Sequence, residues 1–115
     1  MKNFWYAIKG IGQMFFERSF VIEIICGVLV IISVFIYKYS NIEKAILFIM
    51  IFAVLAAEGM NSAIEKTVDL ASPERQKLAG QAKDLAAGAV LLLAVCAVII
   101  AVIIILPKIV NGSFV

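Results

Sequence analysis

Apolar residues form three long stretches along the chain, at about 19–37, 45–57 and 85–106. A helix needs roughly 20 mostly apolar residues to cross the hydrocarbon core of a bilayer. The first stretch carries one charge, Glu23, near its start, and the third carries none. The second continues as a polar helical pattern to residue 69. The pattern therefore predicts three membrane-spanning helices, at about 19–37, 42–69 and 74–106.

Short polar segments separate these helices. Asn41 is a suitable N-cap for the second one. Ser72 followed by Pro73 is typical of an N-cap and a first helical residue, so we expect the third helix to begin there. Pro107 follows the last apolar stretch and predicts its end. No Asn-Gly hairpin signal separates alternating runs, so strands are not expected.

Residues 2–16 precede the first span and have an amphipathic pattern. Phe4, Ile8, Ile11 and Phe15 fall on one helical stripe, which is typical of a helix lying in the membrane interface. A frayed tail is the alternative. With this interfacial helix, the expected fold class is all-α and integral to the membrane, with residues 1–115 forming a single domain.

Composition supports a lipid environment. The 115 residues are 64% hydrophobic with a mean hydropathy of +1.10, more apolar surface than a small soluble domain can bury. The net charge of +2 is too small to suggest a nucleic-acid partner. Histidine is absent from the sequence, so proton transfer near neutral pH would use carboxylates, lysine or tyrosine. Cys26 and Cys96 lie within apolar runs and suggest neither zinc nor a disulfide.

Basic residues are distributed unequally between the two ends of the predicted spans. Seven lysines and arginines lie on the side of the N-terminus and the 66–83 connection, against three on the other side. By the positive-inside rule, the N-terminus and this connection are cytoplasmic and the C-terminus is outside.

The second predicted helix carries a polar stripe where it leaves the membrane. Its members are spaced by three or four residues and share one helical face: Glu58, Asn61, Ser62, Glu65 and Asp69. Glu58 directly follows thirteen uncharged residues. A carboxylate at that depth is costly and usually marks a functional site or faces a partner.

Further charges are expected at the same membrane surface. They are Glu17, Glu23, Glu74, Lys83 and Asp84. Small residues at 80, 87 and 88 would allow two helices to approach closely, so that Lys83 meets the acidic stripe. Asp69 has the alternatives of capping its helix or pairing with Lys66. The set fits interhelical ion pairs at a solvated helix end. It also fits a functional site, for metal-assisted phosphoryl transfer or for ion transport.

Three segments resemble a known family. Residues 58–69, EGMNSAIEKTVD, resemble the ExxNSAIExxVD motif of the small membrane lipid kinases of bacteria, the diacylglycerol kinase and undecaprenol kinase family. Residues 82–90, AKDLAAGAV, resemble its AKDxAAGAV segment, and residues 17–20, ERSF, its entry to the first span. The resemblance implies a homotrimer in the bacterial cytoplasmic membrane that transfers the γ-phosphate of ATP to a lipid hydroxyl.

The resemblance also implies roles for individual residues. Glu58 would be the general base, and Glu17 and Glu65 would hold Mg²⁺ or another divalent cation. Nucleotide contacts would come from Glu17, Asn61, Glu65, Glu74, Gln76, Lys83 and Asp84. The lipid would contact Ser19, Phe20, Glu23, Glu58 and Ala87.

Four departures from the family pattern lie where the lipid should enter, and those at Glu23 and Gly59 are two of them. Glu23 stands where many members have histidine, and Gly59 where leucine or valine is usual. The segment around Ala87 and Gly88 resembles the undecaprenol branch, because the diacylglycerol branch tends to have serine there. Undecaprenol is therefore the favoured substrate, and diacylglycerol the alternative.

Two other classes of protein remain as rivals. A small oligomeric ion or drug transporter coupled through Glu58 would explain a carboxylate inside the membrane, but not a polar stripe that continues to Asp69 and is matched by Lys83. A purely structural or accessory membrane protein would tolerate the loss of Glu58.

Overall fold

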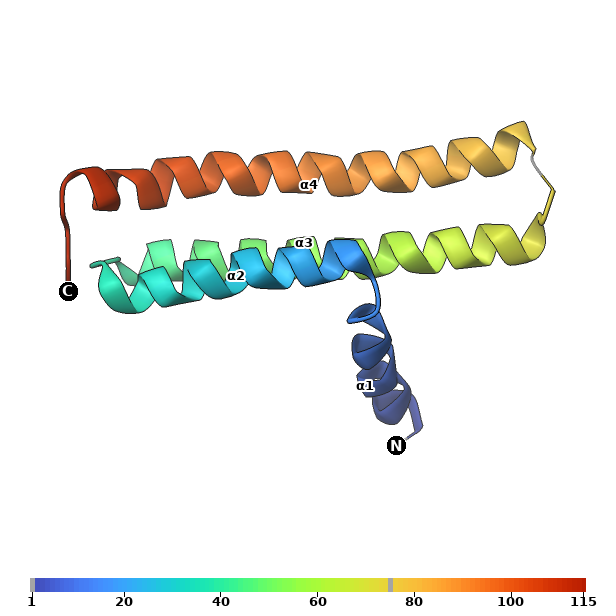
Figure 1. The fold of residues 1–115 in the computed structure, drawn as a ribbon, viewed down its shortest axis with the longest axis horizontal. Coiled ribbons are helices and arrows are strands. Elements are labelled where there is room, and N and C mark those ends of the chain that lie inside the picture. The colour runs from blue at the N-terminus through green and yellow to red at the C-terminus, as the bar shows by residue number, and fades with distance from the viewer. Residues whose placement is uncertain (1, 75) are drawn as a thin grey trace.

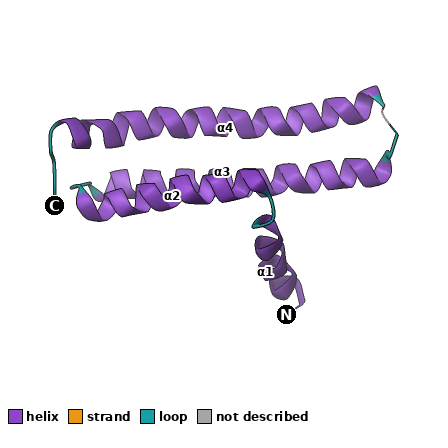
Figure 2. Ribbon diagram, viewed as in Figure 1, coloured by secondary structure: helices purple, strands orange, loops and turns teal. Residues whose placement is uncertain are grey.

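The computed structural model describes residues 2–74 and 76–115, and these form four helices: α1 (Lys2–Met14), α2 (Arg18–Ile36), α3 (Asn41–Ala71) and α4 (Lys77–Val110). Helices α2, α3 and α4 are long and apolar enough to cross a membrane. Short connections join them (Figure 2). The predicted all-α membrane fold, with three spans behind an N-terminal helix, is confirmed.

Helix α3 packs against both other spans, and α4 runs antiparallel beside it along most of its length (Figure 1). A side chain at Gly27 of α2 would come within 3.1 Å of Ile51 of α3, so glycine permits the close approach of these two helices. Few apolar side chains of the described residues are buried. Most of the surface of the spans is therefore left for lipid or for other subunits.

Helix α1 leaves the bundle at a steep angle (Figure 1). None of its residues is buried, and its apolar residues Phe4, Trp5 and Ile8 are exposed. An amphipathic helix set across the direction of the spans can lie in the membrane plane, with its apolar face in the headgroup boundary. The arrangement agrees with the predicted interfacial helix, although α1 ends at Met14 rather than at residue 16.

The turn between α2 and α3 is held by a capping box. Ser40 Oγ accepts a hydrogen bond from the backbone N–H of Glu43 at 3.1 Å, and the Glu43 carboxylate accepts one from the Ser40 N–H at 2.8 Å. The prediction of Asn41 as N-cap was wrong by one residue, because Asn41 is already helical. Serine with glutamate three residues later satisfies two backbone donors at once.

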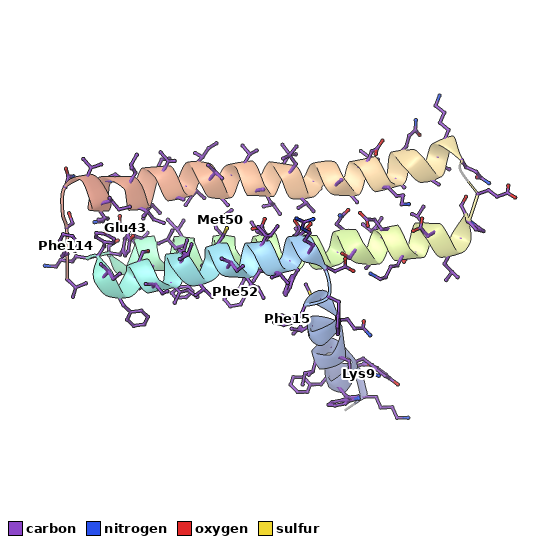
Figure 3. The ribbon with its side chains drawn as sticks, in the orientation of Figure 1. Lys9, Phe15, Glu43, Met50, Phe52 and Phe114 are labelled. Carbon is purple, nitrogen blue, oxygen red and sulfur yellow. The ribbon has the colours of Figure 1, made fainter. Side chains whose placement is uncertain are left out.

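The C-terminal residues fold back onto this turn. Ser113 O accepts a hydrogen bond from the Lys38 N–H at 2.8 Å, and the Phe114 ring stacks on Tyr37 with centroids 5.1 Å apart. Lys108 lies 3.5 Å from the Glu43 carboxylate. Figure 3 shows Glu43 and Phe114 together at this end of the bundle. These contacts join the ends of α2, α3 and α4.

The turn between α3 and α4 differs from the prediction. Ser72 is the C-cap of α3, and its N–H donates to Val68 O at 2.8 Å. Helix α4 begins at Lys77, so the expected start at Ser72 and Pro73 was wrong. A proline with a preceding serine fits a helix start locally, but here the backbone N–H of Ser72 is already used to end α3.

Pro107 does not end α4, contrary to prediction, since the helix continues to Val110. A proline removes one backbone donor and strains the preceding turn, but this one lies close to the C-terminal end. The helix stops at Asn111, and Gly112 follows with a φ of +62°. That left-handed conformation favours glycine, and it turns the tail back toward α2.

Candidate active site

Glu58 lies about halfway along α3, near the level at which α1 joins the bundle. Its side chain is half-buried. The carboxylates of Glu23, on α2, and Glu65, two turns further along α3, lie close enough for their charges to act on that of Glu58. Three acidic residues from two helices therefore lie around the point where α3 leaves its apolar half.

Asn61 and Glu65 continue the polar stripe one and two turns beyond Glu58. Asn61 Nδ2 donates a hydrogen bond to Glu65 Oε1 at 3.1 Å, as expected for residues four apart on a helix. The Asn61 Oδ1 atom is buried and has no hydrogen-bond partner among the described residues. Since buried polar atoms are normally paired, this acceptor is available to a donor from outside the chain.

Glu17, in the connection between α1 and α2, is tied to α3. Its Oε1 atom accepts a hydrogen bond from Lys66 Nζ at 2.7 Å. Lys66 directly follows Glu65 in the sequence, so the structure brings Glu17 to the polar part of α3. The alternative pairing of Lys66 with Asp69 was wrong, and no feature of the local sequence indicates the true partner of Lys66.

Lys83 reaches from α4 to the end of the stripe, as predicted. Its Nζ atom donates to Asp69 Oδ1 at 2.6 Å. This pair borders a cavity of about 110 Å³ at the α3–α4 turn. Ser72, Glu74 and Gln76 also line it. The Ser72 hydroxyl, which the sequence suggested as an N-cap, instead donates to Glu74 O at 3.0 Å within this turn.

Asp84 and Ala87 lie on α4 beyond Lys83 and are exposed. The glycines beside them do not bring helices together within the chain: a Cβ atom at Gly80 or Gly88 would meet nothing within 4 Å among the described residues. The expectation that these small residues mediate close packing was therefore wrong for the single chain.

The residues predicted to contact the lipid differ in their exposure. Phe20 is buried, and the Phe15 ring packs edge-on against it with centroids 5.3 Å apart, whereas Ser19 is exposed. Glu23 borders a largely apolar cavity of about 250 Å³ between α2, α3 and α4. It is the one charged residue among the described residues that line this cavity.

No group of three or more His, Cys, Asp or Glu side chains forms a metal-binding cluster within the described residues. A cluster of that kind suits a metal held by protein alone. Mg²⁺ in phosphoryl-transfer enzymes instead uses one or two carboxylates together with the phosphates of the substrate. Glu65 precedes Lys66 in the sequence, and Glu17 accepts a hydrogen bond from Lys66. These two carboxylates are a candidate pair of metal ligands of this kind.

Comparison with known proteins decides the family. The profile of the prokaryotic diacylglycerol kinases matches residues 5–105. The chain belongs to this family. The chain is 41% identical to the undecaprenol kinase of Bacillus subtilis (strain 168) over 108 residues, which cover 93% of this chain and 88% of that one.

The chain is also similar to two diacylglycerol kinases. The one from Synechocystis sp. is 37% identical over 95% of this chain and 63% of its own length. The one from Escherichia coli (strain K12) is 34% identical over 82% of this chain and 78% of its own length. The protein is thus a lipid kinase with an alcohol acceptor and a multi-pass membrane protein, as predicted. This decides against the transporter and the accessory protein.

Proposed function

We propose that this kinase transfers the γ-phosphate of ATP to the hydroxyl of a membrane lipid alcohol, in a Mg²⁺-dependent reaction that favours undecaprenol. The observation that carries the proposal is the polar stripe of α3. It begins at Glu58, where the helix leaves its apolar half, and ends at Asp69, which Lys83 of α4 contacts. One helix face thus connects the lipid with the aqueous side.

Glu58 is the general base of this proposal. Its carboxylate accepts the proton of the lipid hydroxyl while that oxygen bonds to the γ-phosphorus. The bond between this phosphorus and the bridging oxygen breaks at the same time, and ADP leaves.

The opposite end of the stripe binds the nucleotide. Lys83 is a mobile point charge that can exchange its contact with Asp69 for a phosphate oxygen. Glu74 and Gln76 border the adjoining cavity. Asn61 offers its free Oδ1 acceptor to the nucleotide or to Lys83, and Asp84 lies next to Lys83 on α4. Positioning and charge neutralisation supply most of the catalysis in phosphoryl transfer.

Glu17 and Glu65 are the residues that would hold Mg²⁺. Their carboxylates are hard oxygen donors, and the hydrogen bond from Lys66 brings Glu17 to α3. When bound, the cation neutralises charge on the phosphates. Lys66 would give up its contact with Glu17, which costs little because both side chains are substantially exposed.

Undecaprenol is the preferred acceptor in this proposal, and diacylglycerol is the alternative. The relative named undecaprenol kinase is 41% identical, against 37% and 34% for two diacylglycerol kinases. The exposed Ala87 adds no hydroxyl at the site. Glu23 and Ser19 stand at the entry of α2, where the headgroup of either lipid would approach.

Three copies and an inward-facing site complete the proposal. The exposed apolar surface of the spans offers room for a homotrimer as well as for lipid. The excess of lysine and arginine on the side of α1 and the α3–α4 turn places this side, and with it the active site, in the cytoplasm.

The decisive assay supplies γ-labelled ATP and Mg²⁺ with undecaprenol and diacylglycerol in parallel. Undecaprenol should be labelled with the higher kcat/KM. Glu58→Gln should lower kcat by about 10²–10⁴-fold, the usual contribution of a general base. Glu43→Gln is the matched control, because Glu43 lies at the other end of the bundle and glutamine retains capping ability. Normal turnover by Glu58→Gln would disprove the assignment of the base.

A further inference from the structure

Met14 is the last residue of α1 and the only one of Lys2–Met14 whose side chain is partly buried. The rest of α1 points away from the spans, and Phe15 lies where α1 meets them (Figure 3). The position of α1 relative to the spans therefore depends on Met14 and on the short connection to α2.

The side chain of Met14 rests on Gly59 of α3. A Cβ atom at Gly59 would lie 3.2 Å from Met14 Sδ and 3.8 Å from Cγ, and closer still to the terminal methyl group. Even an alanine would thus require the thioether to move. Gly59 directly follows Glu58, so the contact lies beside the proposed base.

Two other contacts hold the same junction. Phe15 packs against the buried Phe20 of α2, and Glu17 pairs with Lys66 of α3. The ion pair is substantially exposed, and pairs of this kind contribute little to stability. The Met14–Gly59 contact is an apolar attachment of α1 to the helix that carries the proposed base.

We propose that Met14 is a positioning residue for the lipid substrate. By resting on Gly59, it holds the interfacial helix beside Glu58, so that the hydroxyl of an incoming lipid alcohol is presented to the carboxylate. This role depends on the lipid kinase reaction proposed above. Asp69 lies ten residues beyond Gly59, about 15 Å along a helix, so the contact acts at the lipid end and not at the nucleotide end.

The test is a series of variants measured in lipid–detergent micelles with γ-labelled ATP. Met14→Ala and Gly59→Leu should each raise the KM for undecaprenol about five- to tenfold, the effect of losing a partly buried methionine contact. The KM for ATP should stay unchanged, and kcat should stay within about twofold. Gly59→Ala should have a smaller effect, because the flexible end of Met14 can move aside.

Gly59→Ala also answers a purely structural explanation. In a helix interior, alanine is more favourable than glycine by about 1 kcal/mol. The Gly59→Ala variant should therefore not have a lower free energy of unfolding than the parent chain. Met60→Ala is the matched methionine control, since Met60 is exposed on the same helix. It should leave both KM values unchanged.

Combining Met14→Ala with Gly59→Leu separates a direct contact from two independent effects. The double variant should have nearly the lipid KM of either single variant, because each removes the same contact. Fully additive effects, an equal rise in the KM for ATP, or unchanged lipid KM values in the single variants would overturn the positioning role. These outcomes would leave the kinase proposal intact, provided that the parent chain phosphorylates lipid and Glu58→Gln does not. A parent chain that labels no lipid overturns both.

Discussion

At the scale of single residues, the site combines contacts of two kinds. The hydrogen bond from Asn61 to Glu65 joins residues four apart, so the spacing of the motif was enough to predict that they meet. The pair of Lys66 with Glu17 joins residues 49 apart in the sequence. Nothing in the local pattern around either residue indicates that contact, because it depends on where α1 and α2 meet α3.

Lys83 provides a test at this scale. Lys83→Met should lower kcat/KM for ATP by about 10–100-fold, because hydrogen bonds to charged groups are worth roughly 1.5–3 kcal/mol. The free energy of unfolding should change by less than about 1 kcal/mol, since the ion pair with Asp69 is exposed. Steady-state kinetics and thermal unfolding in detergent measure the two quantities.

Lys44→Met is the control for this substitution, because Lys44 lies at the opposite end of α3. Its kinetics should match those of the parent chain. An Lys83→Met variant with unaltered use of ATP would rule out a phosphate contact for this lysine.

At the scale of helices, length separates the membrane part from the catalytic part. Helix α2 has 19 residues, about 28 Å, which matches a hydrocarbon core of roughly 30 Å. Helices α3 and α4 have 31 and 34 residues, about 46 and 51 Å, and so extend beyond the core. Their extensions carry Glu65, Asp69 and Lys83. The hydrophobic pattern predicted these helices but placed several of their ends incorrectly.

The capping box of α3 provides a test at the scale of helices. Ser40→Ala should destabilise the protein by about 1 kcal/mol, because the first turn of α3 loses the acceptor for the Glu43 N–H. Specific activity under stabilising conditions should remain unchanged, since Ser40 lies at the end of α3 remote from Glu58. Unfolding in detergent followed by circular dichroism measures the loss.

Ser113→Ala serves as the matched serine control, because no side-chain hydrogen bond of Ser113 occurs within residues 2–74 and 76–115. Its stability should equal that of the parent chain. Equal stability of Ser40→Ala would show that the capping box contributes nothing measurable.

At the scale of the whole molecule, the two ends of the bundle differ: contacts of the C-terminal tail close one end, and the other carries the proposed nucleotide site. The C-terminal tail, Tyr37 and the Glu43–Lys108 contact close one end. The α3–α4 turn, with its acidic and basic residues, forms the other end. Helix α1 joins the bundle between these two ends (Figure 1). Its last residue, Met14, contacts Gly59, where the sequence of α3 changes from apolar to polar.

The proposed orientation can be tested with single cysteines in a Cys26→Ala, Cys96→Ala background. An impermeant maleimide should label Ser113→Cys in intact cells. It should label Gln81→Cys only after permeabilisation, because position 81 is exposed near the start of α4 on the side rich in lysine and arginine. The reverse labelling pattern would invert the topology and place the active site outside.

The order of apolar and polar residues was sufficient to predict the three spans, the interfacial helix and the polar stripe, because helical periodicity and the length of an apolar run are visible in the local sequence and can be compared with the thickness of a bilayer. The resemblance of the motifs also suggested the residues of the site, and their roles stay predictions. The partner of Lys66, the choice of Asp69 within the stripe as the partner of Lys83, the contact of Met14 with Gly59 and the true helix ends followed only from the packed structure. These features depend on which helices lie side by side and on which backbone N–H and C=O groups at their ends still need hydrogen-bond partners.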